Sequence, residues 1–123
     1  MEKIRVVLAE DNDDLRRVIG LLIDEEPDMV CVASTALLAD VERLVKRHHA
    51  NIALLDLELR DGLVMPHLAA LCSSNPSTRF IIHSGHVNPD LESRTYEAGA
   101  RAYLAKSGDP DELIATIRSV AAV

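Results

Sequence analysis

Five short apolar segments alternate along the chain with five segments whose apolar residues recur at helical spacing. Each apolar segment is too short for an independent helix and is typical of a strand buried within a sheet. Strict alternation of strands and helices predicts βαβ units, which build a parallel sheet covered by helices on both faces. The predicted strands are residues 3–9, 29–33, 52–55, 79–83 and 102–105.

Helix start and stop signals lie between these strands. Asp13 or Asp14 can cap the first helix, which Pro27 closes, and Ser34 or Thr35 can start the second. The three later helices each carry a proline suited to the first helical turn, where its missing N–H costs nothing. These prolines are Pro66, Pro89 and Pro110; Gly99 can end the fourth helix, and Asp109 can cap the fifth.

Length and charge narrow the class of protein. A chain of 123 residues suggests a single domain, 1–123, with one core. The net charge of −7 argues against nucleic-acid binding by the domain itself. Cys31 and Cys72 fall in or beside apolar segments and fit small core residues of a reduced compartment. No apolar run is long enough to span a membrane, so we expect a cytoplasmic protein.

Charged and polar side chains follow four of the five predicted strands. Because the carboxyl ends of parallel strands lie at one edge of the sheet, these side chains are expected to meet there. Asp56 taken alone is equally well explained as the cap of a loop or helix. The whole set is harder to explain by stability, because clustered carboxylates repel one another unless a cation compensates. The set comprises Glu10, Asp11, Asp56, Ser84 and Lys106.

These residue types suit the chemistry of a phosphoryl group. Three carboxylates with open water positions fit a hard divalent cation, for which Mg²⁺ is the natural choice in a cell. Lys106 adds a second positive centre that can neutralise phosphoryl oxygens. Asp56 could then act as the nucleophile, and Ser84 could donate a hydrogen bond to a phosphoryl oxygen.

Four stretches, in order and at the predicted strand ends, resemble the receiver domains of bacterial two-component response regulators. The resemblance covers essentially the whole chain and implies a flavodoxin-like (βα)5 fold, three-layered, with strand order 2-1-3-4-5. The Gly99–Lys106 stretch and the acid- and proline-containing helix start after it look like the NarL/FixJ-type receivers. The four stretches are VVLAEDN at 6–12, IALLDL at 52–57, IIHSG at 81–85 and GARAYLAK at 99–106.

The resemblance assigns a role to each residue of the acidic site. It implies that Asp56 accepts a phosphoryl group from a sensor histidine kinase or a histidine phosphotransfer protein. It implies that Glu10, Asp11 and Asp56 hold Mg²⁺ together with the backbone carbonyl of Glu58. Lys106 is the catalytic, phosphoryl-binding lysine of the pattern.

Two further pairs of positions take their meaning from the same resemblance. Ser84 and Tyr103 stand at the switch positions, and on phosphorylation they are expected to change the surface of the fourth helix, fifth strand and fifth helix. Glu58 and His86 stand at positions that tune the lifetime of the phosphoryl group, although plain surface exposure explains them equally well.

The chain departs from the family pattern at two places. Arg60 stands where the family usually has proline, which leaves the rigidity of that loop open. Its side chain could be solvent-exposed, meet the kinase or fold toward the site. Ser107 replaces a proline that is cis in many relatives, so a trans bond after Lys106 is expected, since a cis bond before a non-proline costs about 3 kcal/mol.

We therefore expect a signalling module rather than an enzyme. Its output would be transcription through a LuxR-type DNA-binding domain that these 123 residues do not include. A stand-alone receiver acting through protein–protein contacts is an alternative, and a small Mg²⁺-dependent phosphatase using Asp56 and Glu58 is another. Homodimers could form through the fourth helix, fifth strand and fifth helix, or through the first and fifth helices.

Overall fold

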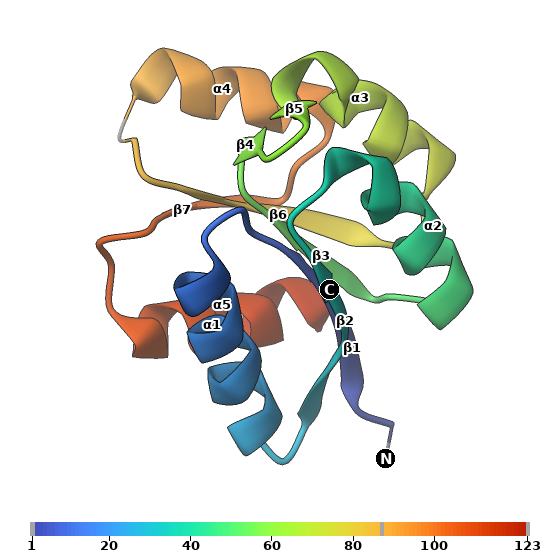
Figure 1. Cartoon of the computed structure of the whole chain (residues 1–123), viewed down its shortest axis with the longest axis vertical. Coiled ribbons are helices and arrows are strands. Elements are labelled where there is room, and N and C mark those ends of the chain that lie inside the picture. The colour runs from blue at the N-terminus through green and yellow to red at the C-terminus, as the bar shows by residue number, and fades with distance from the viewer. Residues whose placement is uncertain (1, 87, 123) are drawn as a thin grey trace.

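Five parallel strands form the central sheet of the computed structural model, which describes residues 2–86 and 88–122 (Figure 1). Their order in the sheet is β2-β1-β3-β6-β7, which is the predicted order 2-1-3-4-5 because β4 and β5 belong to a separate hairpin. All four neighbouring pairs run parallel. The strands are β1 (Ile4–Ala9), β2 (Met29–Thr35), β3 (Ile52–Leu55), β6 (Arg79–Ser84) and β7 (Ala102–Ala105).

Helices cover both faces of the sheet, as the alternating pattern predicted. In Figure 1, α1 (Asp13–Glu25) and α5 (Pro110–Ala121) lie on one side. On the other side lie α2 (Leu38–His48), α3 (Met65–Ser74) and α4 (Pro89–Ala98). The fold is thus a three-layered, flavodoxin-like α/β/α arrangement.

The central strand β3 contributes to both apolar layers. Its four residues are completely buried, and successive side chains point to opposite faces. Ile52 and Leu54 pack with Ile19 and Ile117 on the side of α1 and α5. Ala53 and Leu55 pack into the layer formed with α2, α3 and α4. Burial on both faces explains why this strand has no polar residue before Asp56.

The first two helices begin differently from the sequence prediction. The cap of α1 is Asn12, whose Oδ1 accepts a 2.9 Å bond from Leu15 N, and neither Asp13 nor Asp14 takes that place. The helix ends at Glu25, before Pro27, as predicted.

The prediction that Ser34 or Thr35 starts α2 is wrong. Both residues lie in β2, and Leu37 at the cap position has no side chain able to accept a hydrogen bond. The missing cap is supplied from elsewhere in the sequence: the Asp61 carboxylate accepts bonds from Leu38 N and, at 3.1 Å, from Ala39 N.

The three later helices begin as predicted. Pro66 lies in the first turn of α3, and Pro89 starts α4 after the cap Asn88. Gly99 ends α4 in the left-handed conformation, with φ of 116°. Asp109 caps α5 by accepting a 2.8 Å bond from Asp111 N.

A short antiparallel hairpin follows the third strand of the main sheet. It pairs β4 (Glu58–Leu59) with β5 (Gly62–Leu63), which the sequence analysis did not predict. Leu59 is buried in the α2–α4 layer, and Val64 N donates a 2.8 Å bond to Leu57 O. The hairpin is therefore attached to the core on the side facing α2 and α3.

Three smaller expectations also have an outcome. The described residues contain no cis peptide bond, so the Lys106–Ser107 bond is trans. Cys31 and Cys72 are free and partly buried. Across residues 2–86 and 88–122, none of the helices combines the length and apolarity needed to traverse a bilayer.

Candidate functional site

Main-chain hydrogen bonds between neighbouring strands place three of the predicted site residues at one edge of the sheet. Glu10, one residue beyond β1, donates its N–H to Thr35 O at 3.0 Å. Asp56, one residue beyond β3, donates to Ala9 O at 2.9 Å, and Lys106 N donates to Ser84 O at 2.7 Å. The main chain at each of these residues is therefore fixed by the last hydrogen bond of a strand pairing.

Lys106 joins the two buried carboxylates of the site. Its Nζ donates a 2.8 Å hydrogen bond to Asp56 Oδ2 and lies 2.8 Å from Glu10 Oε1. The second contact is an ion pair without hydrogen-bond geometry, because Glu10 Oε1 has no hydrogen-bond partner among the described residues. The Glu10 side chain is 1% exposed and that of Asp56 is 8% exposed, so one ammonium compensates two carboxylates withdrawn from water.

The pKa values of the charged groups follow from this packing. Burial is the largest influence on Glu10 and raises the pKa of its carboxyl. Burial acts against the charged form of Lys106, but its contacts with the carboxylates of Asp56 and Glu10 outweigh it, and the pKa of Lys106 is raised. The neighbouring Glu10 side chain is the main reason that the pKa of Asp11 is lowered. Lys106 therefore remains charged at neutral pH.

The acidic residues fit a divalent cation. Carboxylate oxygens of Glu10, Asp11 and Asp56 lie within 4.8 Å of one another. Glu10 Oε1 is buried without a hydrogen-bond partner in residues 2–86 and 88–122, whereas Asp11 is exposed beside it. Oxygen donors of this kind, one side of them open to water, are what Mg²⁺ takes in proteins.

Glu58 borders the same cluster through its main chain. Its N–H donates a 3.3 Å bond to Asp56 Oδ1, and it lines the pocket that holds Asp11 and Asp56. Its side chain is exposed, as the simple surface interpretation expected. The backbone of Glu58 is thus close to the predicted metal site.

Ser84 and Tyr103, the predicted switch residues, are connected through His86. The buried Ser84 Oγ accepts a 3.2 Å bond from His86 N, and Tyr103 Oη donates a 2.7 Å bond to His86 O. His86 is itself exposed at the rim of the pocket that Asp56 and Lys106 line. Movement of either switch side chain would therefore break a hydrogen bond to the main chain of His86, which lies between β6 and α4.

Arg60 is solvent-exposed, with 54% of its side chain accessible, and it also folds toward the site, so two of the alternatives left open by the sequence hold together. Its Nη2 donates 2.9 Å bonds to the main-chain oxygen of Asp11 and to Asp13 Oδ1. Arg16 of α1 holds the same loop, with bonds of 2.9 Å to Glu10 O and 2.7 Å to Asp13 Oδ1. Sequence reasoning missed Arg16 because nothing in its spacing shows a contact with a main-chain carbonyl.

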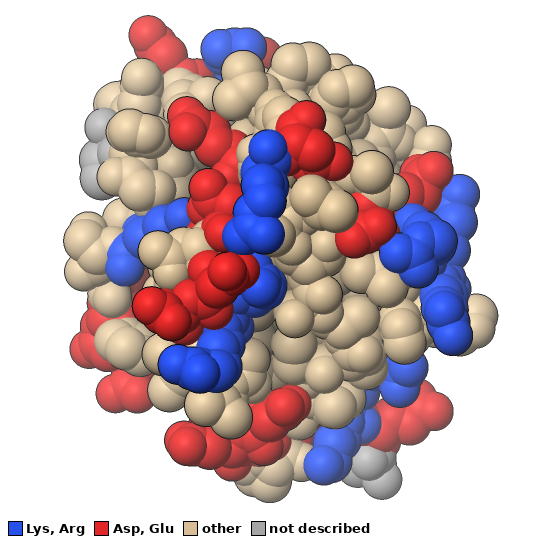
Figure 2. Space-filling model, viewed as in Figure 1, with Lys and Arg blue, Asp and Glu red and all other residues tan. Residues whose placement is uncertain are grey.

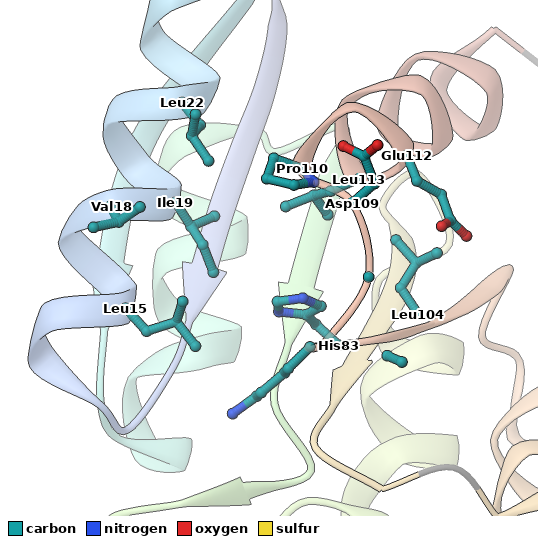
Figure 3. A pocket seen from close by; sticks show the side chains of 13 residues that line it. Leu15, Val18, Ile19, Leu22, His83, Leu104, Asp109, Pro110, Glu112 and Leu113 are labelled. Atoms are coloured by element: carbon teal, nitrogen blue, oxygen red, sulfur yellow. The ribbon is translucent and has the colours of Figure 1, made fainter.

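A second pocket, which Lys106 also lines, lies between α1 and α5 (Figure 3). Its walls are mainly apolar, with Ile19 of α1, Leu104 of β7 and Leu113 of α5 around the imidazole of His83. His83 is 6% exposed, and its Nδ1 has no partner within the described residues. Burial, followed by the charge of Lys106, lowers the pKa of His83 and favours its neutral form.

Acidic and basic side chains are intermixed over the face of the molecule seen in Figure 2. The protein also has ion pairs within single helices, such as Arg16 with Asp13 and Arg43 with Asp40. This face has no continuous basic surface of the kind that follows a nucleic-acid backbone.

Comparisons with known proteins agree with this geometry. The family model described as the response regulator receiver domain matches residues 6–118. The transcriptional regulatory protein DesR of Bacillus subtilis is 29% identical over 119 residues, which are 95% of this chain and 58% of DesR. The oxygen regulatory protein NreC of Staphylococcus epidermidis is 23% identical over 120 residues, 95% of this chain and 54% of NreC. The chain thus spans little more than half the length of either relative.

Solved structures superpose closely on the chain. A two-component response regulator of the LuxR family from Aurantimonas sp. has a TM-score of 0.90 at 26% identity, over 98% of this chain and 86% of that one. The signal receiver domain of a NarL response regulator from Mycobacterium tuberculosis has a TM-score of 0.88 at 24% identity, over 98% of both chains. At 24% identity, the likeness to the NarL receiver domain shows a shared fold and nothing more.

Proposed function

The chain belongs to the family of response regulator receiver domains, and from this premise we propose that Asp56 is its phosphoacceptor. The family consists of modules of two-component systems, and the solved structures that superpose on this chain include a regulator of the LuxR family. The proposed donor is a phosphohistidine on a sensor histidine kinase or a phosphotransfer protein. The observation that carries the proposal is the contact of Lys106 with the nearly buried Asp56 carboxylate beside Glu10 and Asp11.

The hydrogen bonds of Asp56 leave one of its oxygens freer to react. Oδ2 accepts the 2.8 Å bond from Lys106, whereas Oδ1 accepts, among the described residues, only a long, 3.3 Å bond from Glu58 N. In the proposed transfer, an Asp56 oxygen attacks phosphorus, the phosphorus–nitrogen bond breaks, and its electron pair returns to the donor imidazole. Lys106 neutralises the phosphoryl oxygens, and Ser84 donates a hydrogen bond to one of them.

Glu10, Asp11 and Asp56, with the main-chain carbonyl of Glu58, would hold Mg²⁺ in this proposal. Bound there, Mg²⁺ supplies positive charge close to the phosphoryl oxygens during transfer. A cation could reach the cluster where Asp11 is exposed and where Asp56 Oδ1 is held by only a long, 3.3 Å bond from Glu58 N.

The response to phosphorylation would pass through His86. Ser84 Oγ accepts a 3.2 Å hydrogen bond from His86 N. If the Ser84 hydroxyl turns toward the phosphoryl group, this hydrogen bond breaks. Tyr103, which donates to His86 O, would then reorient and alter the surface of α4, β7 and α5. Glu58 and His86, both at the rim of the pocket, are the residues proposed to tune the phosphoryl lifetime.

The output that fits the relatives best is control of transcription through an attached DNA-binding domain. DesR is a transcriptional regulatory protein, and the matched region is 58% of its length. We propose that phosphorylation promotes a homodimer through α1 and α5. Val18 of α1 supports this face, because the residue is 48% exposed and lines the apolar pocket between the two helices.

Intact mass spectrometry tests the phosphoacceptor directly. We expect one phosphoryl adduct after incubation with Mg²⁺ and acetyl phosphate, its loss when EDTA is added first, and no adduct on D56N. D14N is the matched control, because the Asp14 side chain is 92% exposed and should leave phosphorylation intact.

Two other results would count against the proposal. An adduct of undiminished yield on D56N would exclude Asp56 as acceptor, and sustained turnover of a phosphomonoester would favour the phosphatase alternative. If wild type binds Mg²⁺ without forming an adduct, a stable beryllofluoride complex would indicate a very short-lived phosphoryl group. Failure to form that complex would indicate a domain that only docks partners.

A further inference from the structure

Arg60 connects the two loops that carry the acidic residues of the site. It lies in the hairpin that follows Asp56, and its Nη2 crosses to the loop after β1. There it donates to Asp11 O and to Asp13 Oδ1, both at 2.9 Å. The residues joined are 47 and 49 positions apart in the sequence.

Asp11 depends on such a contact more than the other two acids do. Glu10 and Asp56 are each held by a main-chain bond to a neighbouring strand and are buried. Asp11 is exposed, and in the described part of the chain no main-chain hydrogen bond ties its own N–H or C=O to a strand. Its carbonyl is held by the Arg60 side chain instead.

A shared carboxylate keeps Arg60 in this orientation. Asp13 Oδ1 accepts from Arg60 and, at 2.7 Å, from Arg16, which also donates to Glu10 O at 2.9 Å. The carbonyls of Glu10 and Asp11 are thus each held by an arginine, and both arginines are held by Asp13.

The hairpin that carries Arg60 is itself anchored on its far side. Arg60 N donates a 2.9 Å bond to Ala36 O, and the neighbouring Asp61 caps the start of α2. Arg60 therefore extends from a fixed base, so its bond to Asp11 O can restrain the loop.

We propose that Arg60 is a positioning residue for the cation site, holding the Asp11 main chain so that its carboxylate stays beside Glu10 and Asp56. This inference rests on the proposed function, in which those three acids bind Mg²⁺. Arg60 touches neither the cation nor the phosphoryl group; it acts through the loop.

A purely electrostatic effect of Arg60 and a positioning role predict opposite changes in Mg²⁺ affinity when Arg60 is removed. A guanidinium near a cation site repels the cation, so removing it should tighten Mg²⁺ binding if charge were its whole effect. If Arg60 positions Asp11, removing it should weaken Mg²⁺ binding, because Asp11 must then be ordered when the cation binds.

Isothermal titration of wild type, R60A and R60K with Mg²⁺, repeated with Mn²⁺ by electron paramagnetic resonance, separates these cases. We expect binding to R60A to be about tenfold weaker and R60K to be intermediate, because lysine keeps the charge without the guanidinium geometry. R17A is the matched control: Arg17 is a 74% exposed arginine of α1 whose ion pair, with Asp14, is 3.8 Å long. Its removal should leave affinity unchanged or slightly tighter.

Amide hydrogen exchange without Mg²⁺ tests the same role independently of the metal. Asn12 N donates a 3.0 Å bond to Glu10 Oε2 within the loop that Arg60 holds. In R60A its exchange should become faster by about fivefold or more, as for one lost hydrogen bond. An unchanged rate would overturn the proposal.

The remaining outcomes also decide the question. Mg²⁺ affinity in R60A equal to or tighter than wild type overturns the role of Arg60 and leaves the metal site standing. Absence of saturable Mg²⁺ binding in wild type overturns the metal site and this role with it. If R60A does not fold by circular dichroism, the folded R60K decides: weaker binding than wild type supports the proposal, and equal binding overturns it.

Discussion

The Nζ of Lys106 is 2.8 Å from Asp56 Oδ2 and equally 2.8 Å from Glu10 Oε1. Both carboxylates are nearly excluded from water, and the ammonium between them is 21% exposed. A buried carboxylate left without a partner is strongly destabilising, so Lys106 contributes to folding as well as to the proposed chemistry.

Replacing Lys106 with methionine should destabilise the protein when Mg²⁺ is absent. K106M leaves two buried carboxylates without their cation, and we expect the free energy of unfolding in EDTA to fall by about 1–3 kcal/mol, the partial exposure of Lys106 keeping it below a fully buried pair. Mg²⁺ should stabilise K106M more than wild type, because only the metal can then compensate both acids. Urea denaturation with and without Mg²⁺ measures both effects.

An exposed lysine provides the control for this prediction. Lys46 is 58% exposed and pairs with Glu42 at 3.6 Å, so K46M should change the free energy of unfolding by no more than about 0.5 kcal/mol. A K106M protein as stable as wild type in EDTA would show that Lys106 does not stabilise the buried acids.

His83 should make stability depend on pH in the mildly acidic range. Burial lowers its pKa below the ordinary 6.5, so between that value and the lower folded pKa the unfolded chain binds more protons than the native one. The contribution of His83 is thus complete above pH 6.5 and is lost as pH falls through the folded pKa. H83L cannot be protonated and should lose less stability than wild type between pH 7.5 and 5.5 in urea denaturation.

An exposed histidine separates this effect from general acid sensitivity. His67 lies on the solvent side of α3, and H67L should keep the pH profile of wild type. If H83L and wild type lost stability in parallel, the buried imidazole would not be the group that titrates.

The composition of the site could be predicted because it depends on topology alone. Once the strands are known to be parallel, whatever follows each strand meets at one edge of the sheet. Glu10, Asp56 and Lys106 needed no knowledge of side-chain conformation, since main-chain bonds from their own N–H groups place them. The roles given to these residues remain predictions that phosphorylation and metal-binding experiments will test.

The contacts around the site could not be predicted, because they depend on where side chains reach in three dimensions. Asp61 caps α2 from 22 and 23 residues away, and Arg60 reaches Asp11 from a distance of 49 residues. At the start of α1, three successive residues were suitable caps by type, and only the backbone conformation selects Asn12. The sequence showed that Arg60 departs from the family pattern, but it did not show that Arg60 contacts Asp11.

Replacing Ser84 with alanine should loosen the segment that follows β6. The His86 N–H donates to Ser84 Oγ at 3.2 Å, so S84A leaves this amide without that acceptor. We expect its hydrogen exchange to become faster by about fivefold, corresponding to roughly 1 kcal/mol for one hydrogen bond. Y103F, which removes the bond to His86 O, should accelerate exchange at the same amide less. Unchanged exchange in S84A would mean that other contacts hold the segment.

Replacing Val18 with arginine should prevent the proposed homodimer. Val18 is 48% exposed on α1 and lines the pocket between α1 and α5 together with Pro110. An arginine placed there would put an unpaired charge into an apolar interface, which disfavours association. In sedimentation velocity with beryllofluoride and Mg²⁺, V18R should stay monomeric at concentrations where wild type dimerises.

Y96A is the matched change on α4, where Tyr96 is 44% exposed, and it should still dimerise. Loss of the dimer in Y96A but not in V18R would assign the interface to α4, β7 and α5, whereas a wild type that stays monomeric would favour a receiver that acts through other proteins.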